Sequence, residues 1–323
     1  MSSQYGLCQR GITLIYQAVE LEMSLRFVGL KPRSLHSYQR ALLHFFEWMD
    51  EEEIRMPSRY PDLDETLAAY LEHLWLDDFN ITYAGHTLSA LRRFYPQLRY
   101  RLPVARQFFS NWKSIHVPRQ AVPMPASIAL ALAGVALAVK ELNLALVLLL
   151  GFTAFLRTGE MVNLRFTQIQ VHEFNGQIIL ALPATKTSKN KMESVAVNDQ
   201  LLASLTAHAA ATAGGDSLLN LTANQFRRQL SLLLEVLQLE QEKFTGYSIR
   251  RGGASHAFAT GQHFDQLLVT GRWQSVKTAR QYLDSGRASL VQLQFSARSL
   301  QLIHHFQEKA SHFCEQLRQK RTS

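Results

Sequence analysis

Three prolines within eight residues, Pro118, Pro123 and Pro125, interrupt the 323-residue chain about a third of the way along. Proline fixes its own backbone angle, lacks an N–H and disfavours helical backbone in the residue before it. The segment therefore favours extended chain and stops a helix on either side. Because apolar residues recur at helical spacing on both sides, the sequence predicts a mainly α protein with a helical domain over residues 1–115, a basic linker over 116–126 and an α-rich domain over 127–323.

The first domain is predicted from three amphipathic stretches, SLHSYQRALLHFFEWMDEE, DETLAAYLEHLWL and YAGHTLSALRRFYPQL. Their apolar residues follow a helical period, and turns are expected at residues 56–58 and 60–62, where prolines stand among polar residues. About four short helices would then form a compact all-α module, with its aromatic residues in the core.

The second domain contains one region of strand-forming residues. The stretches FTQIQVHE and GQIILALP lie on either side of a turn at Asn175 and Gly176, and ESVAV follows after a lysine-rich connection. A small three-stranded antiparallel sheet is therefore expected within residues 167–198. The long apolar stretch over 128–155 is interrupted by Lys140, Glu141 and Asn143, which predicts buried core helices and no membrane span.

The charge of the chain indicates a polyanionic partner. The formal net charge is +8, and no acidic residue occurs between Asp78 and Glu141, where eight arginines and lysines do. A solvated helix face normally mixes both signs, so a long stretch of one sign favours phosphate contacts; the alternative is a globular protein that is merely basic.

The cysteine content argues against several classes of site. Cys8 and Cys314 stand near opposite ends of the chain and offer no disulfide framework and no metal-ligand cluster. The first residues lack the apolar core of a secretory signal. These features predict an intracellular protein, in the cytoplasm, nucleoid or nucleus, with no metal and no cofactor.

Three residues could together break a phosphodiester bond without a metal. Such chemistry needs a nucleophile and fixed cations that neutralise charge on the non-bridging oxygens. Arg157 in GFTAFLRTGEMVNLR and Arg250 in YSIRRGGASHAF could supply the cations, and Tyr282 in GRWQSVKTARQYLD could supply the nucleophile. Thr158 is expected to cap the helix after Arg157. Taken alone, Arg157 could instead form a purely structural ion pair with Glu160.

These motifs resemble the two conserved boxes of the tyrosine recombinases. The first box of that family, Thr-Gly-Leu-Arg-x-x-Glu, is matched by AFLRTGE, which contains Arg157 and Glu160. The second box combines His-x-x-Arg with a Gly-His or Gly-Trp nine residues before the nucleophile. Here Tyr247 and Arg250 keep the first spacing, and Trp273 precedes Tyr282 by nine residues, as in the Cre-type subgroup. The resemblance spans the chain, since the family joins a helical core-binding domain to a catalytic domain.

The resemblance implies a role for each matched residue. Tyr282 would attack the scissile phosphate and form a 3′-phosphotyrosyl link, which leaves a free 5′-hydroxyl. Arg157 and Arg250 would hold the non-bridging oxygens, and Glu160 would support Arg157. Trp273 could donate its indole N–H to the phosphate but could not relay a proton.

The family also uses a lysine between the second and third strands as general acid for the departing 5′-oxygen. The connection ATKTSKNKMESVAV offers Lys186, Lys189 and Lys191. The Thr-Lys-Thr sequence resembles the Cre-type hairpin and favours Lys186, whereas counting back from the third strand favours Lys191. The lysines without that role would be solvated or contact phosphates.

Tyr247 is the main departure from the family pattern, because it stands where a histidine is usual. A phenol can donate a hydrogen bond to a phosphate, but with an ordinary pKa near 10 it is a poor base for activating Tyr282. His256 and His263 lie nearby in sequence, and packing or surface positions are the favoured interpretation for both.

The implied partner is double-stranded DNA, on which four protomers would assemble over two sites. The residues expected to contact DNA are Arg33, Arg40, Arg92, Arg93, Arg119, Lys189, Lys191 and Arg251. The amphipathic tail over 289–317 is expected to dock into a neighbouring protomer; the alternative is that it caps its own domain. The Gly-Arg-Trp-x-Ser sequence also resembles recombinases of some eukaryotic mobile elements.

The sequence therefore predicts a site-specific DNA recombinase. A type IB topoisomerase or telomere resolvase would use a similar set of residues. A third alternative is a DNA-binding protein that derives from a recombinase and has lost catalysis, which the tyrosine at position 247 makes plausible.

Overall fold

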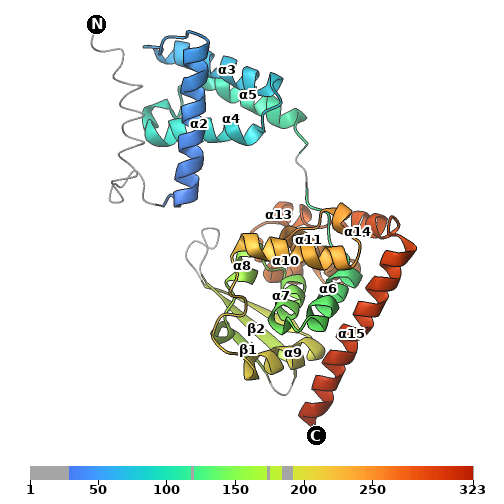
Figure 1. Ribbon diagram of the computed structural model, residues 1–323. Coiled ribbons are helices and arrows are strands. Elements are labelled where there is room, and N and C mark those ends of the chain that lie inside the picture. The colour runs from blue at the N-terminus through green and yellow to red at the C-terminus, as the bar shows by residue number, and fades with distance from the viewer. Residues whose placement is uncertain (1–28, 118–119, 173–174, 184–191, 323) are drawn as a thin grey trace. The chain divides into compact units, whose positions relative to one another are not determined.

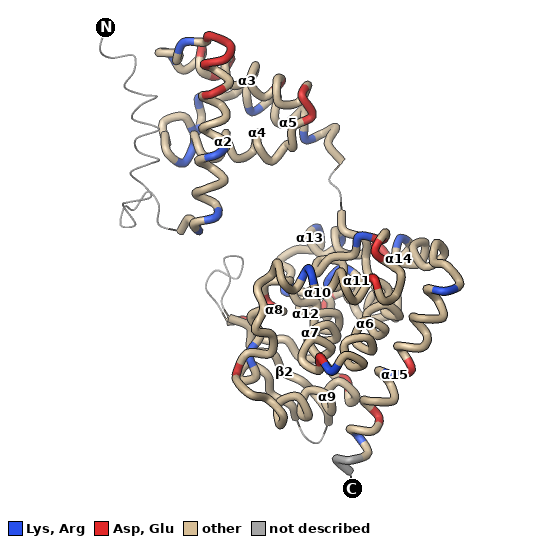
Figure 2. Tube along the Cα trace, in the orientation of Figure 1, with Lys and Arg blue, Asp and Glu red and all other residues tan. Residues whose placement is uncertain are grey.

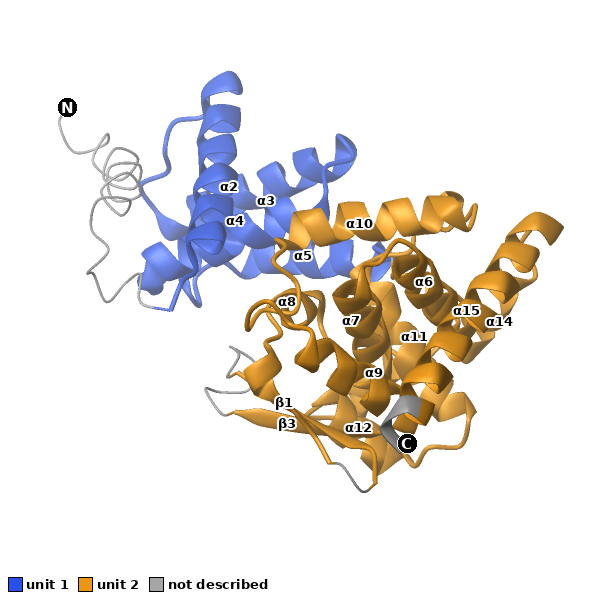
Figure 3. Cartoon of the chain, turned by 60° about the horizontal axis from the view of Figure 1, so that its bottom comes forward, with its two compact units in different colours: residues 1–119 blue, residues 120–323 orange. Residues whose placement is uncertain are grey.

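The computed structural model describes residues 29–117, 120–172, 175–183 and 192–322 (Figure 1). The chain forms two compact units, residues 1–119 and 120–323, which are coloured separately in Figure 3. The described residues are mostly helical, with a single three-stranded antiparallel sheet among them. The predicted fold class is confirmed.

The described part of the first unit is a bundle of helices in which α2 packs on α4 and α3 packs on α5. Its elements are α2 (Pro32–Glu51), α3 (Tyr60–Leu76), α4 (Ile81–Phe94), the short 3₁₀-helix η1 (Pro96–Leu98) and α5 (Pro103–Ile115). The turn predicted at residues 60–62 is wrong, because α3 begins at Tyr60. Proline is favoured in the first turn of a helix, where its missing N–H has no partner to lose, so Pro61 starts this helix and does not break it.

A buried carboxylate on α3 holds the start of α5. Asp64 is 2% exposed and accepts hydrogen bonds from the backbone N–H groups of Val104 (2.8 Å) and Ala105 (2.9 Å). The first N–H groups of a helix lack partners within the helix and carry partial positive charge. Asp64 therefore acts as the cap that Leu102, the residue before α5, cannot provide, and it joins two helices distant in sequence.

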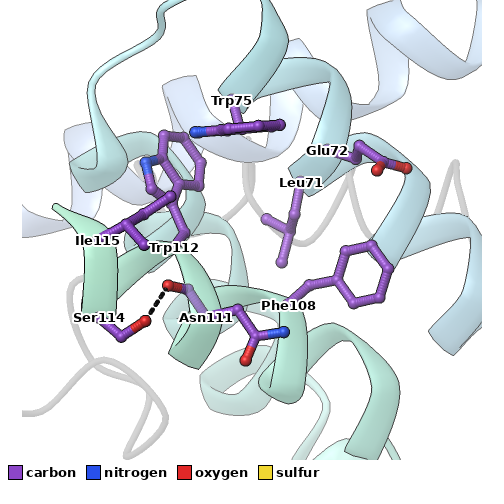
Figure 4. A pocket seen from close by; sticks show the side chains of 8 residues that line it. All are labelled: Leu71, Glu72, Trp75, Phe108, Asn111, Trp112, Ser114 and Ile115. Carbon is purple, nitrogen blue, oxygen red and sulfur yellow. Dashed lines mark hydrogen bonds between the residues drawn. The ribbon is translucent and has the colours of Figure 1, made fainter.

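An apolar hollow of about 370 Å³ lies between α3 and α5 (Figure 4). Trp75 and Trp112 stand at one end of it, and Phe108 and Leu71 line the other. The Ser114 hydroxyl donates to the backbone carbonyl of Asn111 (2.7 Å) at its rim. None of the candidate catalytic residues lines this hollow.

The second unit contains the sheet and the remaining helices. Its elements are α6 (Ala126–Ala138), α7 (Leu142–Thr153), α8 (Thr158–Val162), η2 (Phe166–Gln168), β1 (Ile169–Val171), β2 (Gln177–Leu182), β3 (Glu193–Asn198), α9 (Gln200–Ala211), α10 (Ala223–Val236), η3 (Glu240–Glu242), α11 (Gly246–Ala259), α12 (Phe264–Gly271), α13 (Val276–Arg280), α14 (Ser285–Gln292) and α15 (Ala297–Thr322). The sheet order is β1-β2-β3, with both pairs antiparallel. Leu180 pairs with Ile169 on one side and Val195 on the other, so the sheet lies where the sequence predicts it.

The apolar stretch over 128–155 forms two buried core helices, as predicted. Helices α6 and α7 pack against each other and supply much of the core of the second unit. Lys140 ends the first helix in a left-handed conformation (φ 63°) and separates it from the second. No helix in the described ranges is both long and apolar enough to span a membrane.

Helix α15 packs on α6 and α9 of its own unit. Ile303, Ala310, Cys314 and Leu317 are buried there, and the backbone of α15 at Phe306 approaches α6 so closely that only a glycine fits opposite, at position 134. This is the intramolecular alternative for the tail. The docking of this helix into a neighbouring protomer stays a prediction.

Candidate active site

The first candidate cation lies at the start of α8. The backbone N–H of Arg157 donates to Oε2 of Glu160 (2.7 Å), and its Nη1 donates to Oε1 of the same carboxylate (2.6 Å). Arg157 is itself the residue that caps α8, so the prediction that Thr158 is the cap is wrong by one position. The Glu160 side chain is 7% exposed and that of Arg157 is 32% exposed. A buried carboxylate thus holds a guanidinium that an anion can still reach.

The second candidate cation, Arg250, is fully buried near the start of α11. Its Nη2 donates to the carbonyl of Gly271 (2.7 Å) and its Nη1 to the carbonyl of Phe155, while its Nε–H has no partner among the described residues. Burial, and then the positive charges of Arg272 and Arg157, lower the pKa of Arg250 to about 10. The group therefore stays charged at neutral pH, and each terminal nitrogen still has a second hydrogen to donate.

Two glycines let α11 lie deep enough to bury Arg250. A Cβ at position 252 would overlap the backbone of Met124, and one at position 253 would overlap the backbone carbonyl of Phe152. The N–H of Met124 also donates to the carbonyl of Ser248 (3.0 Å). The glycine pair in YSIRRGGASHAF therefore has a packing reason: both positions meet other backbone directly.

Trp273 and Tyr282 complete the cluster. The Trp273 ring stacks on Phe155 (6.1 Å between centroids, 16°) and lies 4.8 Å from the Tyr282 ring. The guanidinium of Arg250 lies 5.3 Å from the Trp273 ring centroid and 5.1 Å from that of Tyr282. Trp273 is buried, and its indole N–H has no partner within the described part of the chain. The structure thus brings both arginines, the indole and the phenol together.

The backbone beside Tyr282 is fastened to α11 by Ser255. The Ser255 hydroxyl donates to the carbonyl of Tyr282 (3.0 Å) and accepts the N–H of Asp284 (2.9 Å). Ser255 is 1% exposed, so both bonds are shielded from water. The sequence analysis missed this contact, because serine in a helix gives no signal for a partner 27 residues away.

Tyr247 interacts with Tyr282 directly. Burial tends to raise the pKa of the Tyr282 phenol, but a hydrogen bond with Tyr247 and the charges of Arg250 and Arg157 outweigh it, so this pKa lies below its ordinary value. Burial and the same hydrogen bond raise the pKa of Tyr247 well above its ordinary value. Tyr282 therefore loses its proton first, and Tyr247 acts as the hydrogen-bond donor of the pair.

Solved structures with the same fold bind or cleave DNA. No protein-family model matches the chain, and no curated protein matches it in sequence. The structure is similar to the Tn1549 transposon integrase in complex with transposon right end DNA (TM-score 0.59, 12% identity, covering 88% of this chain and 99% of that one). It is also similar to XerH site-specific recombinase in a post-cleavage complex with a difH substrate (0.57, 15%, 85% and 85%) and to a lambda integrase dimer bound to a COC′ core site (0.56, 14%, 86% and 77%).

The chain has the tyrosine recombinase fold.

The candidate site of this tyrosine recombinase fold also contains a third arginine, Arg272, which the sequence does not predict. The side chain of Arg272 is 3% exposed, and its Nη2 donates to Oε2 of Glu160 (2.7 Å). Its Nε lies 3.7 Å from a carboxylate oxygen of Glu193, the first residue of β3. Arg272 directly precedes Trp273 in the motif, but its partners are far away in sequence, so no local pattern could identify this role.

The prediction that Arg251 contacts DNA is wrong. Its side chain is 2% exposed, its Nη1 donates to the carbonyl of Ala121 (2.7 Å), and its Nη2 lies 3.8 Å from Asp284. Helix α11 is enclosed on several sides, so two consecutive arginines are both buried. Arg251 is a structural residue that ties α11 to the chain before α6.

The histidines near the second box take the packing and surface positions that were favoured for them. His256 is exposed on α11 with its ring 5.8 Å from that of Phe152. His263 is the exposed residue that precedes α12. The structure describes no contact of either residue with Tyr282.

The candidate DNA contacts on α2 and α4 of the first unit are exposed. Arg33 and Arg40 are exposed on α2, and Arg92 and Arg93 are exposed on α4, which packs against it. Figure 2 colours the lysine and arginine positions along these helices blue. Arg40 also donates to the Tyr83 hydroxyl (3.0 Å), which links the two helices. Arg119, Lys186, Lys189 and Lys191 lie outside the described residues.

Proposed function

We propose that the protein is a site-specific DNA recombinase that cleaves and rejoins DNA strands through a phosphotyrosine formed on Tyr282. The observation that carries the proposal is the environment of this phenol. It lies against Trp273 and Arg250, accepts a hydrogen bond from Tyr247, and has a pKa below its ordinary value. A tyrosine with a purely structural role has no need of an arrangement that favours its phenolate.

The proposed cleavage step uses the chain's own groups. Tyr282 first loses its phenolic proton to solvent, its phenolate oxygen attacks the phosphorus, a bond forms between them, and the bond from phosphorus to the 5′-oxygen breaks. The partly exposed guanidinium of Arg157 would receive the charge that develops on the non-bridging oxygens, and the family resemblance assigns the same task to Arg250 and Trp273, whose side chains are buried in this structure. The departing 5′-oxygen takes a proton, for which Lys186 is the proposed donor and Lys191 the alternative. Religation reverses these steps, so no nucleotide hydrolysis and no cofactor is needed.

The proposed substrate is double-stranded DNA. The net charge of +8 and the exposed arginines on α2 and α4 support it, together with the likeness to recombinases in complex with DNA. By analogy with the family, four protomers would assemble on two sites.

The test uses suicide duplexes that contain a nick, so that the short fragment released by cleavage diffuses away and the covalent adduct accumulates. A pool with randomised arms replaces the unknown target site, and adducts are detected on denaturing gels. The wild type should form an adduct, and Tyr282→Phe should form none while it binds the pool with unchanged affinity. Tyr100→Phe, at a tyrosine that is 78% exposed in the other unit, is the matched control and should behave as the wild type.

Other outcomes identify the alternatives. Tight binding without any adduct would overturn the proposal in favour of a non-catalytic DNA-binding protein. An adduct accompanied by relaxation of supercoiled DNA of any sequence would indicate a topoisomerase, and conversion of a replicated inverted repeat into closed hairpin ends would indicate a telomere resolvase.

A further inference from the structure

Arg272 occupies a backbone conformation that does not favour arginine. It follows the last residue of α12 with φ 53° and ψ 44°, in the left-handed region, and its N–H donates to the carbonyl of Val269 (3.0 Å). This conformation is usual for glycine at the end of a helix, and a side chain there is strained. The glycine of this segment, Gly271, lies one position earlier, at the end of α12, so the left-handed conformation falls on the arginine. The side chain held in this conformation is almost completely buried, at 3% exposed.

The contacts of this side chain place Arg272 between the two candidate phosphate-binding arginines. It shares the carboxylate of Glu160 with Arg157, since Oε2 accepts both the backbone N–H of Arg157 (2.7 Å) and Nη2 of Arg272 (2.7 Å). It shares the carbonyl of Phe155 with Arg250, since that oxygen accepts Nη2 of Arg272 (3.2 Å) and Nη1 of Arg250. Phe155 is itself in the left-handed region (φ 48°), so the loop that presents this carbonyl is also strained.

The buried carboxylate of Glu160 needs more hydrogen-bond donors than Arg157 supplies, and Arg272 provides one. Glu160 is buried, and a buried carboxylate with one cationic partner keeps oxygen lone pairs that need further donors. With Arg272 in place, the carboxylate is held from two sides and cannot rotate to follow Arg157. The Nε of Arg272 also lies 3.7 Å from a carboxylate oxygen of Glu193 on β3, without a hydrogen bond between them.

We propose that Arg272 is a positioning residue that sets the distance between Arg157 and Arg250 by holding Glu160 and the Phe155 carbonyl in one rigid frame. This inference rests on the proposed function, because it assigns to Arg272 an effect on strand cleavage without any contact with DNA. A misplacement of a catalytic group by about 1 Å can reduce a rate by about a hundredfold, so a residue that only positions can matter as much as one that touches the phosphate.

The test measures the rate of adduct formation at saturating DNA for Arg272→Gly. Glycine accepts the left-handed backbone, so the variant removes the guanidinium without adding strain. We expect the rate to fall about 10- to 100-fold while DNA affinity changes by about twofold or less.

Added guanidinium ion at low millimolar concentration should restore part of the rate of Arg272→Gly, because the ion can enter the space left by the side chain. Lys140→Gly is the matched control, since Lys140 is an exposed cation that is also in the left-handed region, and its rate should stay at the wild-type value.

A second comparison tests the route through Glu160. If Arg272 acts by holding that carboxylate, Arg272→Gly should slow cleavage much less in a Glu160→Gln background than in the wild type. Equal effects in the two backgrounds, or a lowered melting temperature with an unchanged rate, would overturn the inference and leave Arg272 a structural ion pair.

A readout that needs no cleavage separates this inference from the proposed function. The side-chain N–H signals of Arg157 in ¹⁵N-labelled full-length protein, assigned with Arg157→Lys, should shift and exchange faster with water in Arg272→Gly. Absence of any adduct with the wild type would overturn the proposed function alone. Unchanged Arg157 signals in Arg272→Gly would overturn the positioning role alone.

Discussion

The rings of Tyr247 and Tyr282 lie 5.4 Å apart at an angle of 47°, and the two phenols interact with each other through a hydrogen bond. The pair moves the two pKa values in opposite directions, down for Tyr282 and up for Tyr247. Tyr247, which stands where a histidine is expected, therefore does not need to accept the phenolic proton of Tyr282. It can favour the phenolate of its neighbour by donating to it.

Replacement of Tyr247 by phenylalanine should change the pH dependence of cleavage. Without the donor, the pKa of Tyr282 rises, so a smaller fraction is phenolate at neutral pH and the rise of the rate with pH moves to higher pH. We expect a loss of about tenfold or more at neutral pH that narrows as the pH increases. The measurement is the rate of adduct formation from neutral to alkaline pH. A profile that coincides with that of the wild type would show that Tyr247 does not act on Tyr282.

Ser255→Ala should affect both stability and cleavage. The change leaves the carbonyl of Tyr282 and the N–H of Asp284 without their buried partner, which costs about 1–3 kcal/mol of unfolding free energy. It also frees the backbone that carries the nucleophile, so the cleavage rate should fall. Ser289→Ala on α14 removes a hydroxyl that bonds only within its own exposed helix, and it should change stability by less than about 0.5 kcal/mol. Urea unfolding compares the two; equal effects would contradict the role given to Ser255.

Gly253→Ala should destabilise the second unit. A Cβ there overlaps the backbone carbonyl of Phe152 and lies 3.0 Å from the ring of Phe155, and a backbone group cannot move aside as a side chain can. The cost of this overpacking, about 1–3 kcal/mol or more, exceeds the gain of about 0.5–1 kcal/mol that alanine brings to a helix. Gly159→Ala on α8, where nothing lies within 4 Å, should instead be neutral or slightly stabilising. A Gly253→Ala protein that unfolds at the wild-type urea concentration would show that α11 is not packed so closely.

The position of α15 can be tested with two apolar residues on the same helix. Ile303 is 4% exposed against the core, and Leu300 is 48% exposed. Ile303→Ala should lower the unfolding free energy by about 2–4 kcal/mol, whereas Leu300→Ala should lower it by less than about 1 kcal/mol. Chemical denaturation of both full-length variants makes the comparison. If instead Leu300→Ala were the more costly change, or if Ile303→Ala mattered only in a DNA-bound assembly, the helix would belong to another protomer.

Sequence analysis succeeded where the decisive interactions are local. The helices of both units and the three strands follow from the period of their apolar residues, and the contact of Arg157 with Glu160 follows from their spacing of three residues. It failed on Arg251, because adjacent residues of a helix normally differ in exposure, and only the close packing around α11 buries Arg250 and Arg251 together. The sequence also does not predict that Pro61 lies at the start of a helix, because proline occurs both in the first turn of helices and at positions where helices end.

The sequence by itself determined the α-rich composition of the chain, the break near its prolines, the small sheet and the set of residues that could do phosphodiester chemistry. Each of these depends on residues near one another along the chain. Only the tertiary structure decided that Arg272 joins Arg157 through Glu160 and Arg250 through the Phe155 carbonyl, that the Tyr247 ring lies against that of Tyr282, and that α15 packs on its own unit. The physical reason is that burial and hydrogen bonding between distant segments depend on how whole helices pack, and no pattern within one helix records which partner lies opposite.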